Sequence, residues 1–472
     1  MKQGQPHIPV NLSRREVICR AGGGFGALAL SALLAEDEAR SDSSTKQHGT
    51  HFPAKAKSVI WLFMEGGPSH IDLFDPKPAL QRLAGKPLPA SFGRPITAMG
   101  TAENALLPSK RIFKQHGQSG LWVSDWYPEI AKHVDDLTVI RSCWADGLNH
   151  VGGVGQMNTG AVLSGRPSLG AWVQYGLGSA SRDLPTFVVL LDDREPIGGA
   201  KNWSSGFLPA AFQGTQFRPD GNPILALKPP ATIGDEQQKN KLDYITTLNR
   251  HFGETRQDDS ELEARIKAYE LAFRMQSAAP EAIDLSKESA ATKQLYGLDN
   301  KRTATFGANC LMARRLVERG VRFVQLYCGT GSQWDAHSDL EGNHSRLCAV
   351  SDKPVAGLLA DLKARGMLDD TLVIWGGEFG RTPMTEGTTG RDHNPWGFSV
   401  FMAGGGVKGG QVIGSTDEVG LRAAENPVHV HDLHATILHL MGFNHRQLTY
   451  RHDGREERAT VNGGNVVKSV FT

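Results

Sequence analysis

The sequence predicts an α/β protein in which helices cover both faces of a parallel or mixed β-sheet. Apolar, β-branched runs of strand length alternate along the chain with longer stretches that have helical periodicity. Glycine follows several of the helical stretches, as it does at the ends of helices, and polar side chains follow several of the strands. Strands and helices that alternate in this way are typical of a sheet with helical layers on both sides.

The predicted elements follow one another in a regular order. The run 58–64 is uniformly apolar, as expected for a strand that is buried on both faces, and it leads into the polar stretch 65–72. The later predicted strands are 137–143, 186–191, 321–327, 371–375 and 398–403. The predicted helices are 260–276, 304–319, 347–365 and 431–441. Residues 195–260 form a loop-rich insertion that we expect to lie over the functional edge of the sheet.

The composition is that of a globular protein with a large core. The chain has 472 residues, of which 39% are hydrophobic and 21% are charged, and its net charge is +1. A charge near zero, without a block of one sign, gives no reason to expect nucleic acid or another polyanion as a partner. The five cysteines lack a metal-binding spacing and are expected to be buried, although a disulfide is left open.

The N-terminus has the pattern of an export signal. Arg14 and Arg15 precede residues 21–35, a run of Ala, Gly and Leu that is too short and too rich in glycine to span a membrane stably. This pattern is similar to twin-arginine signals, which direct folded proteins to the export machinery. We expect a periplasmic protein without a stable membrane span in its mature part. The expected divisions are a signal at 1–40 that is cleaved or kept as an anchor, a flexible spacer at 41–55 and one domain at 56–472.

Histidines and carboxylates lie next to predicted strands in the last third of the chain. Asp335 and His337 follow one strand, and Glu378 follows the next. His393 comes just before the last strand. The carboxyl ends of parallel strands share one edge of a sheet, so these side chains can meet there. Oxygen and imidazole ligands together suit a divalent metal ion, and the pattern therefore favours metal-assisted hydrolysis.

Several motifs occur in an order that resembles a known family. They are EGGPSHIDLFDPK at 65–77, QMNTG at 156–160, WDAH at 334–337, GEFGRTP at 377–383, GRDH at 390–393, GGGVKGG at 404–410 and HDLHATI at 431–437. Over nearly the whole chain they resemble the sulfatase-like, twin-arginine-exported family catalogued as domain of unknown function 1501 and, through it, the alkaline phosphatase superfamily. The resemblance implies a three-layer α/β/α sandwich with a mostly parallel central sheet and divalent metal ions at the strand ends.

The resemblance also implies metal ligands. They are Asp335, His337 and His393 for one metal, and Glu378 with Asp72 or Glu65 for a second. His344 would replace His337 if a helix begins near it. Relatives have an Asp-His pair where this chain has Glu378, so one ligand of the second metal is missing or comes from elsewhere. Such ligands accept Zn, Mn, Ca or Mg, and the identity of the metal stays open.

The resemblance does not provide a nucleophile. The matching position is Gly152, and residues 143–147 lack the Cys-x-Pro-Ser-Arg pattern of sulfatase maturation. Metal ions can activate water without a protein nucleophile. The alternatives for a ligand, an orienting group or a nucleophile here are His150, Asn149 and Thr159.

Other polar residues have more than one interpretation. Arg381 would bind a substrate oxyanion or pair with Glu378, and Asp392 would bind metal or orient His393. The glycine-rich run 22–27 lacks the preceding strand of a dinucleotide-binding motif, which argues against an oxidoreductase. Structural roles are expected for His434, His439 and the turn 404–410.

The sequence thus favours an exported, metal-dependent hydrolase of phosphate or sulfate esters, with a small molecule or a polysaccharide as substrate. The alternative is a non-catalytic protein that binds carbohydrate or a surface polymer and retains the alkaline phosphatase-like fold. The glycine at position 152 favours the alternative, whereas the clustered ligands favour the enzyme.

Overall fold

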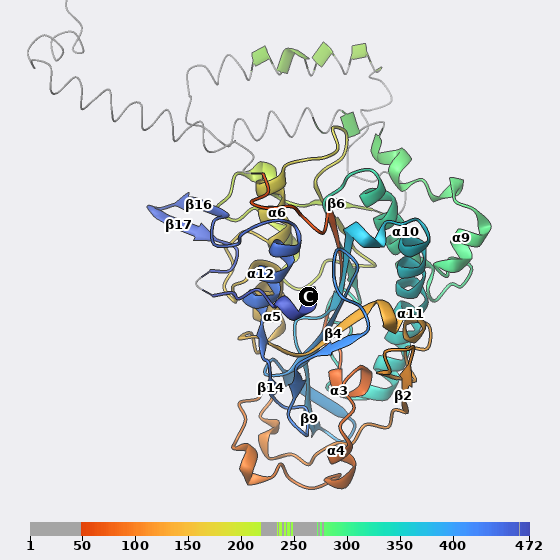
Figure 1. Ribbon diagram of the computed structural model, residues 1–472, viewed down its shortest axis with the longest axis vertical. Coiled ribbons are helices and arrows are strands. Elements are labelled where there is room, and N and C mark those ends of the chain that lie inside the picture. Colours follow the sequence, from red (N-terminus) through yellow and green to blue (C-terminus); the bar gives the residue numbers. More distant parts are fainter. Residues whose placement is uncertain are drawn as a thin grey trace, which may run out of the picture.

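The fold is organised around one large β-sheet (Figure 1). The computed structural model describes residues 49–218, 278–461 and 463–472, together with residues 234, 236, 237, 240, 241, 243–245, 247, 248, 271, 274 and 275. The strands of the sheet are β1 (Ser58–Met64), β4 (Leu137–Trp144), β5 (Phe187–Leu190), β6 (Thr215–Phe217), β7 (Phe323–Cys328), β8 (Thr371–Gly376), β11 (Phe398–Ala403), β12 (Gln411–Ile413) and β15 (Val428–His429). Their order is β12, β4, β11, β8, β1, β7, β5 and β6, and β15 also pairs with β4.

The sheet is mostly parallel, as predicted. Strand β11 is antiparallel to its two neighbours, β4 and β8. The other pairings of this sheet within the described residues are parallel. Because β4 and β8 both run opposite to β11, β4 has the same direction as β8, β1 and β7.

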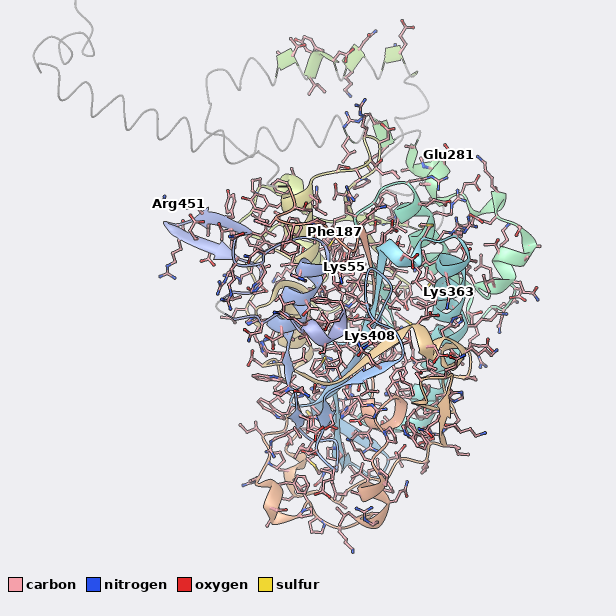
Figure 2. The ribbon with its side chains drawn as sticks, viewed as in Figure 1. Lys55, Phe187, Glu281, Lys363, Lys408 and Arg451 are labelled. Carbon is pink, nitrogen blue, oxygen red and sulfur yellow. The ribbon has the colours of Figure 1, made fainter. Side chains whose placement is uncertain are left out.

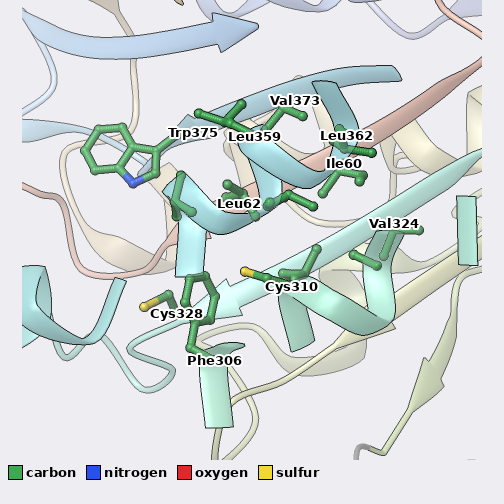
Figure 3. Packing of buried hydrophobic residues seen from close by; sticks show 14 of the residues in the cluster. Ile60, Leu62, Phe306, Cys310, Val324, Cys328, Leu359, Leu362, Val373 and Trp375 are labelled. Carbon is green, nitrogen blue, oxygen red and sulfur yellow. The ribbon is translucent and has the colours of Figure 1, made fainter. Parts of the chain in front are cut away.

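Helices cover the sheet on both faces, which confirms the predicted layers. On one face lie α10 (Ala304–Glu318) and α11 (Leu340–Ala364), and on the other lie α5 (His150–Thr159), α6 (Leu169–Leu177) and α12 (Val430–Leu440). Successive side chains of β1 enter the two cores in turn. Ile60 and Leu62 share a core with Cys310 of α10 and Leu359 of α11 (Figure 3), whereas Trp61 belongs to the opposite core. All of β1 is therefore buried, which explains its uniformly apolar sequence.

The carboxyl ends of β1, β4, β7 and β8 lie at the same edge of the sheet, because these strands share one direction. An antiparallel pair, β9 (Gly380–Glu386) and β10 (Gly390–Asn394), follows β8 at this edge. In this pair His393 stands opposite Arg381. The pair was not among the predicted strands. The segments after the strand ends, together with β9 and β10, carry the polar residues that the sequence singled out.

Smaller elements surround this frame. They are α3 (His70–Leu73), α4 (Pro78–Arg82), β2 (Phe113–His116), β3 (Leu121–Ser124), α9 (Ala290–Leu295), β13 (Ser415–Thr416), β14 (Ala423–Glu425), β16 (Thr449–His452) and β17 (Arg455–Arg458). Figure 2 shows Arg451 projecting from the hairpin of β16 and β17, whereas Phe187 of β5 lies inside. In the part of the chain that the structure describes, no helix combines the length and the apolar character needed to cross a membrane.

Several predicted boundaries differ from the structure. Helix α11 begins at Leu340 instead of 347, because Asp339 caps it by accepting a hydrogen bond from the Gly342 N–H at 3.1 Å. Within the predicted insertion 195–260, residues Thr215–Phe217 form the edge strand β6. The predicted helix 260–276 lies largely outside the described residues.

The N-terminal predictions fall mostly outside the described residues. The signal at 1–40, the run 22–27 and Cys19 all lie there. Residues 49–55 of the predicted spacer are hydrogen-bonded to the end of α12: the His51 N–H donates to the Gly442 carbonyl and the Lys55 N–H to the Leu440 carbonyl, both at 2.8 Å. The cysteines at 143, 310, 328 and 348 are buried and unpaired.

Candidate metal site

Three histidines surround the carboxylate of Asp335. Its Oδ1 lies 2.9 Å from His337 Nε2 and 3.3 Å from His393 Nε2, and its Oδ2 lies 3.0 Å from His150 Nε2. These four residues can each offer a ligand atom, and the ligand atoms all lie within 4.8 Å of one another. We call His150, Asp335, His337 and His393 the central cluster.

Different elements bring the central cluster together. Asp335 and His337 lie in the loop between β7 and α11, and His393 lies on β10. His150 is the first residue of α5, where the Asn149 side chain caps the helix by accepting a hydrogen bond from the Gly152 N–H at 2.9 Å. Asn149 is thus used as a helix cap. The capped helix end fixes the direction in which His150 points.

The second ring nitrogen of each histidine has an acceptor. His150 Nδ1 lies 2.6 Å from Glu378 Oε1, and His337 Nδ1 is bonded to Glu386 Oε2. His393 Nδ1 lies 3.0 Å from the Leu148 carbonyl oxygen. A proton on Nδ1 is favoured by these partners, and each Nε2 is directed at the centre of the cluster, where it would bind a metal ion after losing the proton that it donates to Asp335. Histidines that bind metal ions are usually held in this way.

The charges in the cluster are strongly coupled. Burial raises the pKa of Asp335, but its contacts with the three histidines and the charge of Arg381 together hold it well below the usual range. Burial lowers the pKa of His150, but Asp335 and Glu378 outweigh that effect and raise it to about 9. Positive charge is therefore stabilised between these two carboxylates.

Two members of the central cluster are partly exposed to solvent. The side chains of Asp335 and His337 are 22% and 29% exposed to solvent, whereas that of His393 is 6% exposed. Solvent and a ligand can therefore reach Asp335 and His337.

Comparison of the sequence with protein families identifies the chain. A model described as "Protein of unknown function (DUF1501)" matches residues 56–471, which is most of the chain. The chain belongs to the DUF1501 family. No curated protein matches this DUF1501 chain.

Solved structures that match the DUF1501 chain are distant. The PsFucS1 sulfatase from Pseudoalteromonas sp. is 13% identical, with 93% of this chain and 80% of that chain covered and a TM-score of 0.36. A mutant of TAB5 alkaline phosphatase with Mg bound is 12% identical over 83% of this chain and 99% of that chain, with a TM-score of 0.36. The lipoteichoic acid synthase LtaP from Listeria monocytogenes is 11% identical over 85% and 78%, with a TM-score of 0.33. At such values no residue role is transferred from these proteins.

Glu378 and Arg381 of the DUF1501 chain lie behind the cluster. Glu378 is fully buried, and its two oxygens accept hydrogen bonds from the Gly66 N–H at 3.0 and 3.1 Å, so it orients His150. Arg381 contacts Asp335 Oδ1 at 2.7 Å instead of pairing with Glu378. Its side chain has no exposed surface, so the predicted contact with a substrate oxyanion is not available.

Asp72 and Glu65, the alternatives for a second-metal carboxylate, lie outside the central cluster. Asp72 is fully buried and its Oδ2 is paired with Arg391 Nε at 3.0 Å. Glu65 accepts hydrogen bonds from the Ile197 N–H at 2.6 Å and the Gly331 N–H at 2.8 Å, and burial raises its pKa to about 7. Both carboxylates join segments of the chain near the cluster.

His344 and Asp392 already have other partners. His344 is buried in α11, where its Nε2 accepts a hydrogen bond from the Ser69 N–H at 2.9 Å, so it does not replace His337. Asp392 Oδ2 accepts from the Met99 N–H at 2.8 Å and from the Thr101 hydroxyl at 2.9 Å. Although Asp392 lies close to His337 and Glu386, these bonds assign it to orienting its surroundings.

The remaining candidates are structural. A side chain at Gly152 would place its Cβ 2.8 Å from Val162 Cγ1, so a hydroxyl there requires Val162 to move. Thr159 donates its hydroxyl proton to the Gly155 carbonyl at 2.8 Å within α5. His434 Nε2 lies 2.8 Å from the Met157 carbonyl oxygen, and His439 stacks on Phe471.

Sequence reasoning missed the groups that hold the histidines. Glu386 and the Leu148 carbonyl were not singled out, and a main-chain carbonyl leaves no trace in a sequence. Glu386 lies six residues before Asp392, on the neighbouring strand. The sequence could have pointed to Glu386 only as a carboxylate that lies near a predicted metal ligand. Gly66 was quoted in a motif without a role, although it donates to Glu378.

Proposed function

We propose that this DUF1501 protein is a metal-dependent hydrolase of phosphate or sulfate esters and that the central cluster holds the metal. One observation carries the proposal: the Nε2 atoms of His150, His337 and His393 all face Asp335, while each Nδ1 has its own acceptor. Histidines that bind metal ions usually have this arrangement, with the second ring nitrogen held by an acceptor.

The donor set favours a transition metal. Three imidazoles and one carboxylate suit Zn or Mn, whereas Ca and Mg prefer sites made of oxygen ligands. A bound ion of this kind supplies Lewis acidity, which polarises an ester oxygen and makes water a better nucleophile. Of the four metals that the sequence left open, we therefore propose Zn or Mn.

Three carboxylates of the chain would support metal binding. Glu378 and Glu386 accept hydrogen bonds from Nδ1 of His150 and His337 and fix the orientation of both rings, so that each Nε2 could bind a metal ion once it has lost its proton. Asp335 provides the negative charge that balances a cation. The side chains of Asp335 and His337 are partly exposed, so an ester in solvent can approach them.

Activity that follows metal content tests this proposal. Purified protein is assayed with aryl phosphate and aryl sulfate esters as isolated, after chelation and after addition of Zn or Mn. We expect hydrolysis that disappears on chelation and returns with metal, and none in a His393→Ala variant. A His439→Ala variant is the control, because His439 packs on Phe471 away from the cluster. Metal binding without hydrolysis would instead favour the carbohydrate or surface-polymer binding protein.

We further propose that the protein is exported to the periplasm. Support comes from Arg14 and Arg15 ahead of the mildly apolar run 21–35. Lysine at both positions should leave the protein in the cytoplasm, as cell fractionation would reveal. Unchanged periplasmic accumulation of that double variant would contradict the proposal.

A further inference from the structure

Arg381 occupies an unusual position, because its charged side chain is fully buried against the central cluster. Its Nη2 lies 2.7 Å from Asp335 Oδ1, the oxygen that also faces His337 and His393. Removing a guanidinium from water is costly unless its N–H groups find acceptors. The hydrogen-bond acceptors of Arg381 therefore identify the segments of the chain that its side chain connects.

The other acceptors of Arg381 are main-chain carbonyls from three segments. Nε donates to the Gly67 carbonyl at 2.8 Å, and Nη2 donates to that of Gly66. Nη1 donates to the Arg391 carbonyl at 3.2 Å, two residues before His393 on β10. Nη2 also lies 3.4 Å from the carbonyl of Trp334, which precedes Asp335. One side chain thus joins the turn after β1, the loop with Asp335 and the strand with His393.

The turn after β1 links this network to the fourth ligand. The Gly66 N–H donates to Glu378, and Glu378 in turn holds His150. A Cβ on Gly66 would lie 2.5 Å from the Asp335 main-chain nitrogen, so the turn and the Asp335 loop are in direct contact. Through Gly66, the position of Arg381 is therefore coupled to His150 as well.

We propose that Arg381 is a positioning residue that sets the metal affinity of the central cluster without contacting metal or substrate. Its Nη2 holds Asp335 Oδ1 in place, and its planar fork fixes the three segments in register. Lysine offers a single point charge and cannot match acceptors on three segments. This inference rests on the proposed function, since it concerns the metal site assumed there.

The structure offers a matched control for Arg381. Arg391 is also fully buried, and it lies on the neighbouring strand β10. Its Nε pairs with Asp72, and its other nitrogens donate to the carbonyls of Thr382, Pro383 and Leu107. Because its side chain makes none of its hydrogen bonds or ion pairs with the central cluster among the described residues, its loss should disturb folding without a direct effect on Asp335.

Zinc affinity tests the proposal. The Kd for Zn²⁺ is measured by competition with a chromophoric chelator for the wild type, Arg381→Met, Arg381→Lys and Arg391→Met, each corrected for the folded fraction from near-UV circular dichroism. We expect Kd to rise by about 10- to 100-fold in Arg381→Met, the range seen when groups that support metal ligands are lost. Arg381→Lys should lie between that variant and the wild type, and Arg391→Met should match the wild type. Excess zinc should restore occupancy in both Arg381 variants.

The possible results separate two kinds of failure. A wild-type Kd in both Arg381 variants would overturn the positioning role and leave the proposed function intact. An equal loss of affinity in Arg391→Met would overturn it too, because the effect would then be one of general stability. If Arg381→Met does not fold, Arg381→Lys decides by itself. Wild-type protein that binds no zinc or manganese would overturn the proposed function and this inference with it.

Discussion

Individual side chains behind the central cluster decide whether the histidines can act as ligands. Glu378 holds His150 and Glu386 holds His337, and neither carboxylate belongs to the cluster itself. Glutamine at either position keeps an acceptor oxygen but loses the charge. We predict that Glu378→Gln and Glu386→Gln each raise the Kd for zinc by roughly 10-fold or more. The measurement is chelator competition.

Glu341 provides the comparison for these two variants. It lies on α11 and pairs with Arg111, outside the central cluster. Glu341→Gln should keep the wild-type Kd for zinc. If the Glu378 and Glu386 variants also keep it, the carboxylates do not support metal ligands, and the hydrogen bonds to Nδ1 have another purpose.

The sequence predicted the location of a site residue where the end of a neighbouring strand was enough to place it. The sequence placed Asp335, His337 and His393 at one edge of the sheet, and the structure brings these three together. It did not show the direction of each side chain. Glu378 lies just past β8 as expected, but there it faces Gly66 and His150, and His150 takes the fourth place in the cluster. Such directions depend on turns whose geometry a sequence does not specify.

Among the elements, the turn after β1 is the one on which the site depends most. Gly66 has φ +118, and an added Cβ would lie 2.5 Å from the Asp335 nitrogen. Gly85 has φ +73 with nothing within 4 Å of an added Cβ. We predict that Gly85→Ala costs about 1–2 kcal/mol, from backbone strain alone. Gly66→Ala should cost more and also weaken zinc binding, because the Asp335 loop must move.

Urea unfolding and zinc titration of the two alanine variants test this prediction. Equal losses of stability in both, with zinc affinity unchanged, would mean that the turn is not coupled to the cluster.

The elements themselves were predictable to different degrees. The buried strands β1, β7, β8 and β11 were recognisable because both of their faces are covered and apolar. The pair β9 and β10 was not recognisable. Its buried positions include Arg381, Arg391, Asp392 and His393. These polar side chains are buried because they form hydrogen bonds or ion pairs with other polar groups of the protein. Hydrophobic patterning cannot identify a strand that is buried for polar reasons.

Over the described chain as a whole, buried neutral histidines make the fold sensitive to acid. Burial lowers the pKa of both His344 and His434 to about 3, compared with an ordinary value of 6.5. Below pH 6.5 the unfolded chain takes up a proton at each site that the folded chain does not. Stability should therefore fall as the pH drops from about 6.5 towards 3, by about 1.4 kcal/mol per pH unit for each histidine.

A variant that lacks one of these two histidines tests the predicted direction of the pH dependence of stability. His434 contacts the Met157 carbonyl through Nε2, and glutamine can offer an N–H in its place. Between pH 6 and 4, the unfolding free energy of His434→Gln should fall less steeply with decreasing pH than that of the wild type. The difference between the two slopes should correspond to the uptake of about one proton on unfolding. Identical slopes would mean that His434 titrates normally in the folded protein.

The overall architecture followed from the sequence more completely than the site did. Alternating strands and helices predicted a parallel or mixed sheet with helices on both faces, and the structure has a mostly parallel sheet covered in this way. The insertion at 195–260 was less predictable. Its Pro-rich and Gly-rich composition gave no sign that Thr215–Phe217 extends the sheet, since three residues are too few for a periodic pattern.

Elemental analysis of the mature protein, purified without chelator, tests the metal site most directly. Wild-type protein and Asp335→Ala are compared at equal folded concentration. We predict at least one tightly held Zn or Mn ion per chain in the wild type and its loss in the variant, because Asp335 faces all three histidines. A folded wild type that holds no transition metal, or a variant that holds as much as the wild type, would contradict the assignment of the central cluster.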